Sequence, residues 1–214
     1  MSYDFWLLPA EHCQPAAAAR AFALAQDEAD EPATSIASSL AADISAVNAD
    51  LTEEQGFLSV TPLSGTGAAV FVPSPWRRIQ DARDVMVPRA FAADYGMYDP
   101  QLDIVLSPRS SVAGRFSTSR EGTFPTITPD LIDHFVGAMK VDDFVVVETS
   151  DEVYIQTTRV DIKAFAIEHR AGSADQHFGT EVVAAPEVVG MMKAWLASGD
   201  VAITDQHSWT KTAL

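Results

Sequence analysis

Four short β-rich segments, joined by polar turns, lie in the last third of the chain. Val, Ile, Phe, Thr and Tyr are frequent in them, and each segment is five or six residues long. The segments are Phe144–Glu148, Val153–Thr158, Ala164–His169 and Phe178–Val183. Successive strands joined by short turns pair antiparallel, so this pattern predicts an antiparallel meander.

Helices are predicted mainly in the N-terminal half, where apolar side chains recur at helical spacing. The clearest apolar stripe belongs to residues 34–48 and consists of Ile36, Leu40, Ile44 and Val47. In residues 79–95 we expect Pro88 to kink or delay the helix and Gly96 to end it in a left-handed conformation. The predicted helices cover residues 14–28, 34–48, 79–95, 128–139 and 185–196.

Further strands are predicted before the meander. We expect a first strand over Tyr3–Leu8 and another over Leu102–Leu106. Between them, Phe57–Val60 and Ala69–Val72 are expected to pair as a hairpin. Residues 107–123 form a polar stretch that is rich in Ser and Gly and contains Arg109, Arg115 and Arg120. Arginines could bind phosphate or carboxylate there, but the composition favours a mobile loop.

Strand-rich and helix-rich stretches are partly segregated along the chain, and this predicts an α+β fold. We expect an antiparallel sheet, formed by the C-terminal meander, packed with helices that lie mostly in the N-terminal half. A chain of 214 residues suits either one domain over 1–214 or two packed halves near 1–125 and 126–214.

Acidic residues outnumber basic ones by 30 to 14, which gives a net charge of −16 at neutral pH. This charge opposes binding to nucleic acid or to an anionic membrane and favours a basic partner. Cys13 is the single cysteine, so an intramolecular disulfide is excluded. No signal peptide is recognisable, and no stretch reaches the ~18 apolar residues of a membrane span. We therefore expect a cytoplasmic protein.

The sequence lacks the motifs of the commonest catalytic and cofactor sites. The turn at Gly65 and Gly67 lacks the longer pattern of a phosphate-binding loop, and β-prone residues follow it. No serine lies in the Gly-x-Ser-x-Gly pattern of a hydrolase, and Cys13 has no basic neighbour that would activate a thiolate. We predict no catalytic residue, no metal site and no cofactor.

Two histidines, His169 and His177, flank the turn over residues 170–176. Their imidazoles could approach each other across a hairpin, but zinc sites need several ligands and no third ligand is apparent. We expect exposed turn histidines instead.

Five carboxylates lie within eleven residues around the first hairpin of the meander, with only Lys140 immediately beside them. They are Asp142, Asp143, Glu148, Asp151 and Glu152. Turn and strand-end residues escape burial, so we expect most of the five to be exposed together and to attract a basic surface, with Tyr154 supplying a desolvated contact. Two alternatives stay open: simple solvated turns, or a carboxylate pair for acid–base chemistry or Mg²⁺.

Three short passages are similar to sequences of other proteins. They are Met1–Trp6, Tyr95–Gln101, and Glu168–Phe178 followed by a helix and the C-terminal Trp209. Together they resemble small acidic bacterial proteins, many actinobacterial, that look like immunity proteins of polymorphic toxin systems. The resemblance implies a protein that neutralises a toxin by binding it. Residues 16–50 and 107–123 depart from that pattern.

The sequence thus predicts a non-catalytic protein-binding module, most specifically an immunity-type inhibitor of a basic toxin. The negative charge supports this independently, because it accelerates association with a cationic protein. One alternative is an enzyme, such as a carboxylate-based hydrolase, with a site assembled from distant residues; another is a self-associating structural protein. A pocket with two convergent carboxylates or histidines would favour the enzyme, and a flat acidic face with exposed aromatics would favour the binder.

Overall fold

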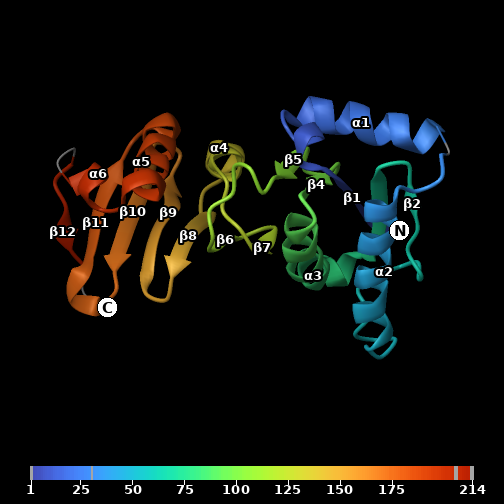
Figure 1. Cartoon of the computed structure of the whole chain (residues 1–214). Helices are drawn as coiled ribbons and strands as arrows, with labels where there is room; N and C mark the ends of the chain where they lie inside the picture. Colours follow the sequence, from blue (N-terminus) through green and yellow to red (C-terminus); the bar gives the residue numbers. More distant parts are fainter. Residues whose placement is uncertain (1, 30, 205–206, 213–214) are drawn as a thin grey trace. The chain divides into compact units, whose positions relative to one another are not determined.

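The computed structural model describes residues 2–29, 31–204 and 207–212 and divides into two compact units, Met1–Ser111 and Val112–Leu214 (Figure 1). Each unit combines helices with its own antiparallel sheet, so the predicted α+β class is confirmed. The division between the units lies inside the polar stretch 107–123.

The first unit is a five-stranded sheet in the order β2-β3-β1-β4-β5. Its strands are β1 (Ser2–Pro9), β2 (Gly65–Thr66), β3 (Ala69–Pro75), β4 (Tyr95–Asp99) and β5 (Ile104–Leu106). Its helices are α1 (Ala16–Ala29), α2 (Ser35–Ala49) and α3 (Ile79–Ala92), with the short 3-10 turns η1 (Ala10–His12) and η2 (Trp76–Arg78). Strand β1 is central, with β3 and β4 on either side of it, and its residues Phe5, Leu7 and Leu8 are fully buried.

Helix α2 begins where its capping residue predicts, whereas α1 begins at Ala16, two residues after the predicted start. The Thr34 side chain accepts a hydrogen bond from Ala37 N at 3.2 Å, and α2 starts at the next residue. Pro88 lies inside α3 without ending it.

The predicted left-handed cap at Gly96 is wrong. Helix α3 ends at Ala92, the left-handed residue is Asp94 with φ 55°, and Gly96 belongs to β4. A Cβ atom at Gly96 would lie 2.5 Å from Cys13 Sγ and 2.6 Å from the Leu106 carbonyl oxygen. Glycine is therefore required there for close approach rather than for a turn.

The predicted strand Phe57–Val60 is also absent. Oδ1 of Asn48 accepts hydrogen bonds from the backbone N–H groups of Phe57 and Leu58, at 2.8 and 3.0 Å. A side chain of α2 thus satisfies the donors that a neighbouring strand would otherwise engage, and β3 pairs instead with the two-residue β2.

The second unit is a seven-stranded sheet in the order β12-β11-β10-β9-β8-β6-β7. Its strands are β6 (Arg115–Thr118), β7 (Gly122–Phe124), β8 (Phe144–Ser150), β9 (Val153–Asp161), β10 (Ala164–Ala171), β11 (His177–Val182) and β12 (Thr210–Lys211). Its helices are α4 (Pro129–Ala138), α5 (Ala185–Ser198) and α6 (Val201–Thr204), with the 3-10 turn η3 (Ala174–Gln176). Strands β8 to β11 form the predicted meander, each paired antiparallel with the next.

Two short strands occupy the stretch that was predicted to be a mobile loop. Strand β6 pairs with both β7 and β8, and this pairing places Phe116 opposite Val147 and Phe124. All three side chains are buried, so a hydrophobic contact with the distant strand β8 orders a segment whose own composition is polar.

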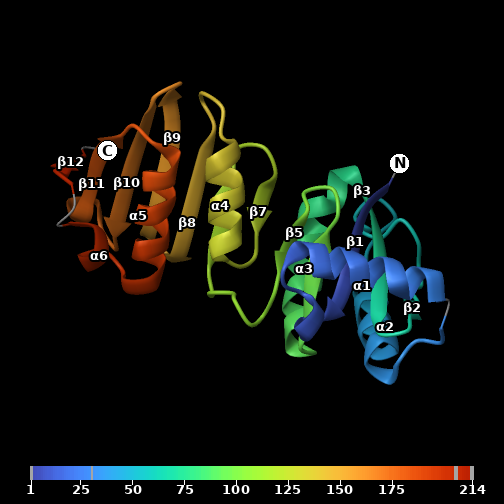
Figure 2. The same ribbon diagram turned by 90° about the horizontal axis from the view of Figure 1, so that it is seen from above.

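The two faces of the second sheet differ. Helices α4 and α5 lie side by side on one face, with α5 packed against β9, β10 and β11 (Figure 2). Phe165, Ile167 and His169 of β10 are buried on this helix-covered face. Because side chains alternate along a strand, Glu168 and Arg170 lie on the opposite face, here called the open face. None of the helices in the described residues has the length and apolar character needed to cross a bilayer.

Candidate functional site

The five predicted docking carboxylates form two groups at opposite ends of β8. Asp142 and Asp143 precede the strand, whereas Glu148 lies near its far end and Asp151 and Glu152 form the turn to β9. A seven-residue strand is about 23 Å long, so the two groups are well separated. The structure therefore does not bring all five together.

Asp143 stabilises its own end of the sheet. Its carboxylate accepts hydrogen bonds from the Lys140 N–H at 2.6 Å, from Arg120 Nε at 2.9 Å and from the Ser119 hydroxyl at 3.2 Å. Partial desolvation opposes ionisation, but these hydrogen bonds outweigh it and lower the pKa of Asp143. Asp142 beside it is exposed, with φ 70°.

Glu148, Asp151 and Tyr154 lie together at the other end, and we call this group the turn site. Glu148 faces Tyr154 across the β8–β9 ladder, and Asp151 is exposed. Glu148 and Asp151 also line a hollow of about 290 Å³. The lining residues are Gly114, Arg115, Glu148, Thr149, Ser150 and Asp151. The fifth carboxylate, Glu152, forms an ion pair with Arg170.

The prediction that His169 and His177 are exposed turn residues is wrong, because both are buried. His169 pairs with Phe178 and His177 with Arg170 across β10 and β11, so the two imidazoles lie on opposite faces of the sheet. They cannot share a metal ion. Among the described residues, no three histidine, cysteine or carboxylate side chains are grouped as a metal site would require.

His169 instead lines a cavity of about 380 Å³ beside α6, here called the α6 cavity. Its lining residues are His169, Ala171, Gln176, Phe178, Asp200, Thr204, His207 and Trp209. They come from β10, η3, β11, α6 and the segments that flank α6, so residues distant in sequence form this cavity. Two histidines and one carboxylate contribute to its wall.

A carboxylate and an imidazole meet in this cavity. Nδ1 of His169 lies 3.0 Å from Oδ1 of Asp200, but the ring is not oriented for a hydrogen bond, so the contact is electrostatic. Trp195 Nε1 donates to the same oxygen of Asp200 at 2.7 Å and fixes the carboxylate. Desolvation lowers the pKa of His169 although Asp200 opposes this, so the imidazole is neutral at pH 7.

Sequence reasoning missed the α6 cavity, although one pattern could have revealed part of it. Phe165, Ile167 and His169 occupy alternate positions of one strand, which places the imidazole on the buried apolar face. The proximity of Asp200 was not predictable, because it depends on where the chain turns after Gly199, which takes φ 70° at the end of α5.

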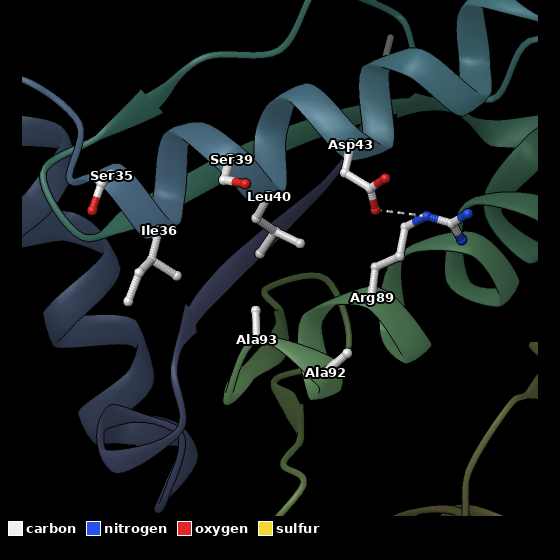
Figure 3. Close-up of a pocket in the computed structure, with 8 residues that line it drawn as sticks. All are labelled: Ser35, Ile36, Ser39, Leu40, Asp43, Arg89, Ala92 and Ala93. Atoms are coloured by element: carbon white, nitrogen blue, oxygen red, sulfur yellow. Dashed lines mark ion pairs between the residues drawn. The ribbon is translucent and has the colours of Figure 1, made fainter.

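A second cavity, of about 450 Å³, lies between α2 and α3 in the first unit. Its lining residues are Ser35, Ile36, Ser39, Leu40, Asp43, Arg89, Ala92 and Ala93 (Figure 3). The two charged side chains point toward each other, with Arg89 Nε 3.0 Å from Asp43 Oδ2 (Figure 3). This pair neutralises itself and leaves no net charge for a ligand.

A buried ion pair in the first unit was also missed. Arg83 Nη2 lies 3.2 Å from Oδ2 of Asp99, and the side chains of both residues are fully buried. Tyr3 donates its hydroxyl to the same carboxylate at 2.7 Å, and the backbone N–H groups of Gln101 and Leu102 donate to its other oxygen. Asp99 therefore joins the central strand, α3 and the β4–β5 turn.

Comparisons with protein-family models, with curated proteins and with solved structures found no match to this chain.

Proposed function

We propose that this chain is a non-catalytic protein-binding module, specifically an immunity-type inhibitor that acts in the cytoplasm by docking a basic toxin at the turn site. The observation that carries the proposal is the grouping of Glu148, Asp151 and Tyr154 at one end of β8, where the two carboxylates line a surface hollow. The net charge of −16 supports a basic partner, because complementary charge raises the association rate.

The turn site combines the two kinds of contact that a protein interface needs. Tyr154 is half-buried on the open face, so a partner can cover the rest of its ring and gain a desolvated aromatic contact. Glu148 and Asp151 supply charge at the edge of that contact, where it affects the rate of encounter more than the final affinity. Arg115 lines the same hollow and restricts docking to a cation placed close to the carboxylates.

The two ends of β8 provide a matched test. We would measure the association of candidate basic toxins with the Glu148→Gln/Asp151→Asn variant and with the Asp142→Asn/Asp161→Asn control. Each variant loses two negative charges, and Asp161 lies with Asp142 at the end away from the turn site. We expect the first variant to associate about 3- to 10-fold more slowly at low salt and the control to change less than about twofold.

Salt dependence separates the possible outcomes. A weaker dependence of the association rate on salt for Glu148→Gln/Asp151→Asn alone supports docking at the turn site. An equal decrease of the association rate in both variants would assign the effect to overall charge and would overturn the turn site. If the wild-type protein forms no complex with any candidate toxin, the proposal of an inhibitor is itself overturned.

One observation favours a second candidate function, that of a hydrolase with a site assembled from distant residues. His169, Asp200 and His207 line one cavity, and a neutral imidazole beside a carboxylate can act as a general base toward water. A screen with nitrophenyl ester and amide substrates tests this role. Turnover that disappears in the His169→Gln variant would replace the non-catalytic proposal.

A further inference from the structure

We propose that the α6 cavity binds a guanidinium group, which it would hold between the Asp200 carboxylate, the His169 imidazole and the Trp209 ring. This site is independent of the proposed docking function, because it opens on the helix-covered face of the sheet, whereas Tyr154 lies on the open face. Three features of the cavity select this chemistry.

The first feature is an unsatisfied buried imidazole. His169 is only 2% exposed, and among the described residues neither of its ring nitrogens has a hydrogen-bond partner. Most buried polar groups in folded proteins do have such a partner. A neutral imidazole keeps one nitrogen lone pair, so a ligand that donates a hydrogen bond would satisfy it.

The second feature is a fixed carboxylate at the cavity wall. Asp200 is held by Trp195, while its side chain remains 30% exposed. Glu187 lies close to the cavity as well, 3.6 Å from Nε2 of His207. Two carboxylates and a neutral His169 give this region a negative potential, which excludes anionic ligands and favours a cation.

The third feature is the aromatic wall. The Trp209 and His169 rings meet edge to face with centroids 4.6 Å apart, and Phe178 stacks on His169 at 5.6 Å. Trp209 is fixed by a hydrogen bond of 3.2 Å from its Nε1 to the Ile203 carbonyl oxygen. Indole faces attract cations, and a planar cation can stack on them.

Geometry favours guanidinium over ammonium. A guanidinium has five N–H donors in one plane, so it can bind a carboxylate, donate to an imidazole and stack on a ring simultaneously. An ammonium has three donors and no flat face. The cavity volume of about 380 Å³ lies within the range of ligand pockets and accommodates an arginine side chain with its stem.

The test uses argininamide as the probe and the full chain as the receptor. We expect saturable binding, with a dissociation constant on the order of 1 mM, followed by the indole N–H resonance of Trp209 and the ring resonances of His169. Asp200→Asn should weaken binding at least about tenfold, because it removes the charge but keeps an oxygen for Trp195. Asp43→Asn, in the cavity between α2 and α3, is the matched control and should leave binding unchanged.

Two further probes define the ligand class. Urea has the shape of guanidinium without its charge, and lysinamide has the charge without the plane; both should bind at least about fivefold more weakly than argininamide. Equal binding of lysinamide would overturn the selectivity for guanidinium. No binding of any guanidinium probe, or undiminished binding to Asp200→Asn, would overturn the site.

The same chemistry has two possible sources, a free guanidino compound and an arginine side chain of a protein. Argininamide and a short peptide with one central arginine, each compared with its lysine counterpart, distinguish them. Tighter binding of argininamide identifies a small-molecule site, and tighter binding of the arginine peptide identifies a side-chain receptor. If the wild-type protein binds a toxin but does not bind argininamide, this inference is overturned and the proposed function remains intact.

Discussion

Each unit contains an aspartate whose carboxylate lies against a basic side chain in or beside the core. The two pairs differ in how many of their polar atoms have a hydrogen-bond partner within the fold. Asp99 is fully buried in the first unit and is contacted by Arg83, by Tyr3 and by two backbone N–H groups. Asp200 in the second unit is partly exposed, and the imidazole of His169 beside it has no hydrogen-bond partner among the described residues.

This difference separates a structural role from a binding role. A buried carboxylate that several groups contact, such as that of Asp99, holds elements together, and removing it leaves the opposite charge uncompensated. A pair that keeps unsatisfied polar atoms at a cavity wall contributes little to stability but offers those atoms to a ligand. The same residue type, Asp, thus takes two roles according to how many of its contacts are made within the fold.

The largest expected effect is that of Asp99→Asn. This change leaves the buried Arg83 guanidinium without its counter-charge, so we expect the free energy of unfolding of the first unit to fall by about 3–5 kcal/mol. The equivalent Asp200→Asn change should cost less than about 1 kcal/mol, because Asp200 is partly solvated. Urea denaturation of both variants measures the difference, and equal losses would contradict the comparison.

Cys13 provides a readout that is specific to the first unit. It is the only cysteine and is fully buried there, and desolvation raises the pKa of its thiol to about 12. Reaction with a thiol reagent near neutral pH therefore requires opening of this unit. Asp99→Asn should accelerate the labelling of Cys13, whereas Asp200→Asn should leave its rate unchanged.

The second expected effect is a partial rescue. Adding Arg83→Met to Asp99→Asn removes the orphaned charge, while asparagine still accepts the hydrogen bond from Tyr3. We expect the double variant to regain about 2 kcal/mol relative to Asp99→Asn alone. A double-mutant cycle by urea denaturation measures this coupling, and additive losses would show that the charge pair is not the source of the stability.

Some elements of this fold could be predicted from the sequence and others could not. Local chemistry was enough for α2 with its Thr34 cap, for α5 before Gly199 and for the meander, because spacing and turn residues lie within each segment. Strand β6 was not predictable in this way, since it is stabilised by pairing with β8, which follows about 30 residues later.

The same distinction between local sequence and tertiary packing applies to the candidate sites. The carboxylates of the turn site were visible as an acidic stretch, but only the fold showed that β8 separates Asp142 from Asp151. Asp99 and Arg83 are 16 residues apart and belong to a strand and a helix, so their contact depends on tertiary packing. The same holds for His169 and Asp200, which meet only where α6 begins beside β10.

The third expected effect is a dependence of stability on pH in the second unit. His169 has a lowered pKa in the folded state, against about 6.5 when unfolded. Below that pH the unfolded chain binds a proton that the folded chain does not, so the free energy of unfolding decreases as the pH falls. Asp200 and His207 line the same cavity as this imidazole, and His177, on the opposite face of the sheet, also lowers the pKa of His169.

The His169→Phe variant isolates this contribution. Its free energy of unfolding should vary less steeply with pH between about 7 and 5, by at most about 1.4 kcal/mol per pH unit for one proton. Urea denaturation at several pH values measures both slopes. Identical slopes for the wild type and the variant would show that His169 is protonated equally in both states.

The smallest expected effect is the change in stability caused by His169→Phe at pH 7.5. The imidazole makes no hydrogen bond within the described residues, and a phenyl ring preserves the stacking on Phe178 and the contact with Trp209. Replacing an unsatisfied polar ring by an apolar ring of similar shape should alter the free energy of unfolding by less than about 1 kcal/mol. The same variant should lose argininamide binding. A loss of more than about 3 kcal/mol would instead give His169 the structural role of Asp99, and the distinction between the two aspartate sites would then fail.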